Sequence, residues 1–153
     1  MTLEDILHMN SGSGDSSYAN NSLFTKIVMQ KTAPFLKRTI KGIAKQNTFF
    51  DHCFIFADLG CSSGMNTLLL ASDVIDIIHE LCLENNRHTP QFQVCLNDLF
   101  GNDFNNDKGD KFGPCFVSAV PGSFYGRLFP DESLHLIHSS YSVHWLSQVC
   151  VNI

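Results

Sequence analysis

Apolar residues recur with the period of an α-helix in two stretches of the chain. The first stretch begins at Ser22 and continues to Ile43, although Pro34 is expected to kink or divide the helix. The second runs from Leu68 to Leu83. Its predicted buried face is Val74, Ile75, Ile78, Leu81 and Cys82, and its predicted outer face is Ser72, Asp73, Asp76 and Glu80.

Strand patterns lie between and after these helices. The apolar run Cys53–Ala57 fits a buried strand, and Gln91–Asn97 alternates apolar with polar positions. Two further strands are predicted over Cys115–Val120 and Leu134–Ser139. Because strands alternate with helical segments, the predicted class is α/β with a mostly parallel, doubly wound sheet. We expect a helical arm over residues 1–50, whose polar loop 10–17 can close over a ligand, and a Rossmann-like domain over residues 51–153.

A glycine-rich turn, Asp58-Leu59-Gly60-Cys61-Ser62-Ser63-Gly64, separates the first predicted strand from the second helix. Its glycines allow a sharp turn and a close approach of ligand to backbone, and the helix start offers free N–H groups. The turn lacks the lysine of a phosphate-binding P-loop and the spacing of a dinucleotide fingerprint. An acidic residue before the glycines suits a cofactor with a cationic amino group and no phosphate. An ordinary strand–helix turn would give the same pattern.

Ligands of open α/β sheets bind beyond the carboxyl ends of the strands, so residues at the other strand ends are candidates too. Asp98 can accept hydrogen bonds from two ribose hydroxyls, or it can cap a turn. The Ser123 hydroxyl can contact the edge of an adenine, and the Phe124 ring can stack on its face. After the fourth strand, the indole N–H of Trp145 can orient a carboxylate, and His144 can donate likewise or only fill volume.

Composition narrows the possible partners. The net charge is −5 and no Lys/Arg cluster stands out, which argues against nucleic acid. No apolar run reaches membrane-spanning length, and the first residues are acidic, so we expect a cytoplasmic protein without a membrane partner. The six cysteines are scattered without C-x-x-C pairs and are interpreted as reduced thiols. No metal site is predicted.

Taken together, these segments resemble the plant SABATH methyltransferases, which include salicylate, benzoate and jasmonate carboxyl methyltransferases and the xanthine N-methyltransferases of caffeine synthesis. The resemblance extends in order from about Leu7 to Val149. It rests on the segments Leu7–Asn10, Ser17–Ser22, Ala57–Gly64, Leu96–Leu99, Gly101–Asn105, Pro121–Pro130 and His138–Gln148.

The resemblance implies a Rossmann-like methyltransferase sheet and an S-adenosylmethionine cofactor. It also implies a small carboxylic acid such as benzoate, salicylate or jasmonate as acceptor, with xanthine N-methylation as the alternative. A homodimer is possible, and the family's Mg site would lie beyond the end of this chain. Implied cofactor contacts are Tyr18, Asp58, Gly60, Cys61, Asn66, Asp98, Leu99, Ser123 and Phe124, and implied acceptor contacts are Thr25, Tyr141, His144 and Trp145. No catalytic base is implied, because a carboxylic acid is already ionised at neutral pH.

The sequence departs from the family pattern in three places. Thr25 stands where salicylate-type enzymes have a glutamine that grips the carboxylate, so salicylate itself is disfavoured. No helical stretch separates Asn105 from Cys115. The chain also stops after Val149 with a tail that does not match the family, so we expect the N-terminal portion of a methyltransferase, without the helical cap and poorly active alone.

Overall fold

The structure is a computed structural model that describes residues 23–45, 52–62, 65–104 and 115–142, except for the side chains of residues 23–26 and 65. The predicted loop 10–17 and the candidate residues Tyr18, His144 and Trp145 lie outside this part, as does the side chain of Thr25.

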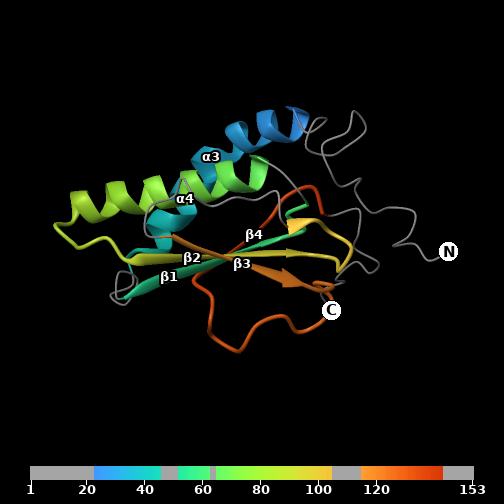
Figure 1. Cartoon of the computed structure of the whole chain (residues 1–153). Helices are drawn as coiled ribbons and strands as arrows, with labels where there is room; N and C mark the ends of the chain where they lie inside the picture. The colour runs from blue at the N-terminus through green and yellow to red at the C-terminus, as the bar shows by residue number, and fades with distance from the viewer. Residues whose placement is uncertain (1–22, 46–51, 63–64, 105–114, 143–153) are drawn as a thin grey trace, which may run out of the picture.

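Four strands form one parallel sheet in the order β3-β2-β1-β4 (Figure 1). The strands are β1 (Cys53–Leu59), β2 (Gln91–Asp98), β3 (Cys115–Pro121) and β4 (Leu136–Ser139). Each predicted strand is present, and the predicted parallel sheet is confirmed. β4 starts two residues later than predicted, although the His135 N–H still donates to the Ile55 carbonyl at 2.8 Å.

Alternation along the two central strands creates one apolar face. Phe54 pairs with Phe92 and Phe56 with Val94 in the register of β1 and β2, and these side chains are at most 2% exposed. Burying a side chain of this size contributes about 1.5–3 kcal/mol. The period-2 pattern therefore fixes which side of each central strand faces the core.

Two helices cover this apolar face (Figure 1). α4 (Met65–Glu84) follows β1 and packs Val74 and Ile78 against the sheet, both fully buried. α3 (Leu23–Ile43) lies against α4 and buries Ile40 completely. On α4, Asp73, Asp76 and Glu80 are exposed as predicted, whereas Ser72, which was also predicted on the outer face, is half-buried.

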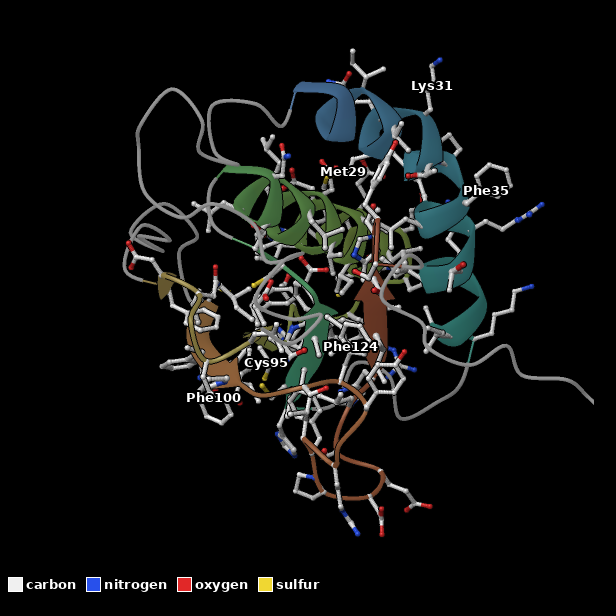
Figure 2. All side chains as sticks on the ribbon, turned by 90° about the vertical axis from the view of Figure 1, so that its right-hand side faces the viewer. Met29, Lys31, Phe35, Cys95, Phe100 and Phe124 are labelled. Carbon is white, nitrogen blue, oxygen red and sulfur yellow. The ribbon has the colours of Figure 1, made fainter. Side chains whose placement is uncertain are left out.

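The path of α3 differs from its prediction. The helix continues through Pro34, so proline does not divide it, and a kink at Pro34 stays a prediction. In the second half of α3, Leu36 and Ile40 face the core. Phe35 is 61% exposed and points away from it (Figure 2). Met29 packs against the core instead. Because α4 lies along only one side of α3, the buried face of α3 is narrower than the face that the apolar pattern predicted.

The opposite face of the sheet carries no helix within the described residues. The segment between β3 and β4 lies on that side (Figure 1), and Phe116 and Ile137 are 62% and 58% exposed there. No described helix is both long and apolar enough to cross a membrane. The cysteines in the described ranges, all but Cys150, are free thiols.

Candidate functional site

The carboxyl ends of the strands form the candidate site. β1 continues through α4 to β2 on one side, whereas β4 lies on its other side, so the strand order reverses at β1. Such a switch point is where open α/β sheets bind ligands. Figure 2 looks toward this edge and shows Phe124 near the ends of β1 and β4, with Phe100 off to one side.

The glycine turn after β1 is held in one conformation. Gly60 has φ +73° and Ser62 has φ +56°, both in the left-handed region. The N–H groups of Gly60 and Cys61 donate to the Asn97 carbonyl at 2.9 and 3.0 Å. A Cβ at Gly60 would lie 2.5 Å from Ser142 Oγ, the end of a side chain that can rotate away, so the left-handed backbone is the main reason for glycine at this position. The turn thereby connects the end of β1 to the end of β2.

Asp98, at the end of β2, receives two backbone hydrogen bonds. The Ser62 N–H donates to Oδ2 at 2.6 Å, and the Leu99 N–H donates to Oδ1 at 2.8 Å. Burial raises the pKa of the Asp98 carboxyl, these two hydrogen bonds oppose that rise, and the nearby Asp58 carboxylate adds to it. Each carboxylate oxygen has a second lone pair, so the group can still accept two hydroxyl donors.

Asp58, the last but one residue of β1, is 6% exposed. Its Oδ1 lies 2.8 Å from Nδ1 of His138, which is its partner in the register of β1 and β4. Two carboxylates on adjacent strands therefore lie at the switch point, and one of them is paired with an imidazole.

Asn97 connects the end of β2 to the end of β3. Its Nδ2 donates to the carbonyls of Val120 and Gly122 at 2.8 and 2.9 Å, and the Gly122 N–H donates to the Asp98 carbonyl at 2.8 Å. These bonds hold the segment that begins at Gly122 beside the glycine turn. Phe124 Cε1 is accordingly 3.9 Å from the position of a Cβ on Gly60.

The structure thus brings together six of the predicted cofactor residues, Asp58, Gly60, Asp98, Leu99, Ser123 and Phe124. Cys61 and Asn66 lie deeper, at 6% and 7% exposure, and the Cys61 thiol donates to the Ser62 carbonyl. Tyr141, a predicted acceptor contact, follows β4 with φ +58° and is 44% exposed. The remaining predicted residues, Tyr18, His144, Trp145 and the side chain of Thr25, are not described.

Three residues of the site received no role from the sequence. Asn97 orders the neighbouring strand, His138 contacts Asp58, and the Asn102 side chain donates to the Ser62 carbonyl at 2.9 Å. The sequence did contain a signal for His138. It follows the buried Leu136 by two positions and therefore lies on the same, core-facing side of the strand, where a polar residue is unusual. No comparable signal marks Asn102, which acts from a loop.

Comparison with known proteins decides the family. Residues 4–153 match the family model of SAM dependent carboxyl methyltransferases. The chain belongs to this family. It is 52% identical over 159 residues to a probable methyltransferase of Theobroma cacao (94% of this chain, 43% of the relative). It is 46% identical over 166 residues to a probable caffeine synthase of Coffea canephora (97% and 43%). The predicted SABATH membership is confirmed.

A solved structure shares the fold of this family member. A loganic acid methyltransferase with SAH (S-adenosylhomocysteine) is 34% identical and superposes with a TM-score of 0.82, covering 93% of this chain and 42% of that protein. The predicted methyltransferase sheet is therefore confirmed. The chain spans about 43% of the length of the curated relatives it matches.

The residues at the switch point fit S-adenosylmethionine, the cofactor of the family. Asp98 offers acceptors for ribose hydroxyls, and Asp58 offers a negative charge for a cationic amino group. The Ser62 hydroxyl in the turn is buried and has no hydrogen-bond partner within the described ranges. Orphaned polar atoms of this kind are typical of sites that a ligand or water completes.

Proposed function

We propose that the chain forms the cofactor-binding part of an S-adenosylmethionine-dependent methyltransferase that acts on the carboxylate of a small plant acid. The observation that carries this proposal is a pair of carboxylates, the buried Asp58 and the half-buried Asp98, at adjacent strand ends beside a fixed glycine turn. The described turn contains no lysine or arginine that would favour a phosphate over a cationic ligand.

In this proposal each strand end holds one part of the cofactor. Asp98 accepts the ribose hydroxyls and Asp58 lies beside the methionine end. The Ser123 hydroxyl contacts the edge of the adenine and the Phe124 ring stacks on its face. The adenine then lies close to the glycine turn, because Phe124 Cε1 is 3.9 Å from the position of a Cβ on Gly60. The backbone of Gly60 and Leu99 completes the wall, with Cys61, Asn66 and Tyr18 assigned by family resemblance. The arm over residues 1–50 then covers the bound cofactor.

Methyl transfer on this scaffold depends on positioning. The cofactor supplies a methyl group on a positively charged sulfur. The residues assigned to the acceptor, Thr25, Tyr141, His144 and Trp145, would hold a carboxylate in line with that methyl and exclude water from it. A carboxylate is already ionised at neutral pH, so no residue has to remove a proton.

Xanthine N-methylation is the second candidate, because several relatives are named for it, among them a 7-methylxanthine methyltransferase of Coffea canephora at 46% identity. The third possibility is a product without activity of its own. We propose that the 153-residue chain alone transfers methyl groups far more slowly than a full-length relative, because it exposes the apolar Phe116 and Ile137 on an open sheet face and spans only about 43% of the length of its curated relatives.

Two measurements test these proposals. Isothermal titration with S-adenosylhomocysteine tests the cofactor site, and absence of binding would refute it. A radiolabelled methyl-transfer assay with benzoate, salicylate, jasmonate and xanthosine then separates the acceptor classes. Turnover on xanthosine but on none of the acids would refute the carboxylate proposal, and turnover equal to that of a full-length relative would refute the expectation of poor activity. Sedimentation of the same sample tests the homodimer that the family resemblance implies.

A further inference from the structure

A partly buried contact between β1 and β4 has no role in the proposed cofactor binding. The Asp58 carboxylate and the His138 imidazole are 9% and 21% exposed, and their Oδ1 and Nδ1 atoms lie 2.8 Å apart. Within the described ranges, His138 is the only side chain that is hydrogen-bonded to Asp58. The two residues are 80 positions apart in the chain, and the parallel register alone makes them neighbours.

The chemistry of the pair determines the direction of its hydrogen bond. An ionised carboxylate can only accept, so Nδ1 of His138 carries the hydrogen. The terminal torsion of an aspartate is broad, and one bond to Oδ1 restricts it. The second oxygen, Oδ2, is then held in a defined direction for a ligand.

We propose that His138 is the positioning residue of Asp58, and that protonation of His138 switches off the attraction of this strand end for the cationic part of the cofactor. The inference rests on the proposed cofactor site and adds its regulation by pH. With His138 neutral, the pair carries one negative charge. With His138 protonated, the pair is neutral and the Coulomb attraction for a cationic amino group is lost.

The charged groups around the pair come from several elements. Asp58 comes from β1 and Asp98 from β2, and Asp73 of α4 lines the groove that His138 also lines. From α3, that groove receives Thr32, Thr39 and apolar side chains. Lys37 and Lys41 of α3 are paired with Glu80 and Glu84 instead. Asp58 therefore contacts His138 directly, Asp73 lines the same groove, and no described lysine or arginine lines it.

The experiment measures S-adenosylhomocysteine binding by isothermal titration at about pH 8 and about pH 6, since histidine ordinarily changes charge in this range. His138→Asn keeps a side-chain N–H donor near the position of Nδ1 but cannot be protonated, and His138→Ala removes the donor. The exposed His79 on α4 gives the matched control His79→Asn. Circular dichroism confirms that each variant is folded.

The unmodified chain and His79→Asn should lose about tenfold in affinity between the two pH values, a change of about 1.4 kcal/mol. His138→Asn should bind within about threefold of the unmodified chain at the higher pH and lose little at the lower pH. His138→Ala should bind about tenfold more weakly at both. Any acid effect of Asp98 is shared by all variants and cancels in the comparison.

Two outcomes would overturn the inference while leaving the proposed function intact: unchanged affinity in His138→Ala, or an undiminished pH effect in His138→Asn. If the unmodified chain does not bind at either pH, the proposed cofactor site fails. The positioning role is then judged by nitrogen-15 spectra of His138 in the free chain. A dominant Nδ1–H form that disappears in Asp58→Ala supports the pairing, and a dominant Nε2–H form refutes it.

Discussion

Replacing Asp98 by asparagine should separate cofactor binding from folding stability. The side chain keeps its shape, but the carboxylate loses its charge and one of its two acceptor oxygens. In the structure these oxygens accept the Ser62 N–H at 2.6 Å and the Leu99 N–H at 2.8 Å. In the variant one of the two N–H groups loses its acceptor, and the ribose hydroxyls lose a charged partner.

The two effects have different magnitudes. Hydrogen bonds to a charged group contribute about 1.5–3 kcal/mol, so binding of S-adenosylhomocysteine should weaken by roughly 10- to 150-fold. Stability should change less, by about 1 kcal/mol or below, because two contributions oppose each other. Burial raises the pKa of Asp98, so its ionised form costs folding free energy at neutral pH and the amide relieves that cost. The orphaned N–H group costs about the same in the other direction.

Isothermal titration gives the affinity, and urea unfolding followed by circular dichroism gives the stability. Asp76→Asn on the exposed side of α4 is the matched control, with no expected change in affinity. A dissociation constant for Asp98→Asn within twofold of the unmodified chain would show that Asp98 does not hold the ribose. An equal loss of stability and binding would show that Asp98 acts only through the fold of the turn.

Three further results are expected. In the His138→Asn background, affinity for S-adenosylhomocysteine should fall at acid pH, with a midpoint above the ordinary pKa range of an aspartate. The reason is that burial raises the pKa of Asp98 and binding needs its ionised form. A midpoint within the ordinary range would contradict this. Gly60→Ala should lower the free energy of unfolding by about 1–3 kcal/mol, because φ +73° is strained for a residue with a Cβ. Gly101→Ala, with nothing within 4 Å, should change it by less than about 0.5 kcal/mol, and equal effects in urea unfolding would refute the reasoning. Phe124→Ala should weaken cofactor binding by about 1–3 kcal/mol through lost stacking on the adenine, whereas Ala at the 81% exposed Phe100 should not; titration calorimetry that finds the two alike would remove Phe124 from the site.

Local pattern predicted the elements well because burial on one side imposes a period. Phe92, Val94 and Leu96 face the core at alternate positions of β2 and are each at most 2% exposed, although Cys95 and Asn97 on the other side of the strand are buried too. The glycine turn was also predictable, because only a residue without Cβ adopts the backbone of Gly60 cheaply. Pattern was less reliable on α3. Phe35 has helical spacing yet lies exposed, since which side of that helix is buried depends on where α4 lies.

The sequence by itself determined the class of fold, the glycine turn after the first strand and the acidic residues at the strand ends, because these follow from local periods and single residue types. Only the tertiary structure decided which strand ends meet. Asp58 lies beside His138, not beside the end of β3, because β4 pairs with β1 in the order β3-β2-β1-β4. Strand order depends on how the crossover segments pack on the sheet, and no local pattern in β1 or β4 encodes it.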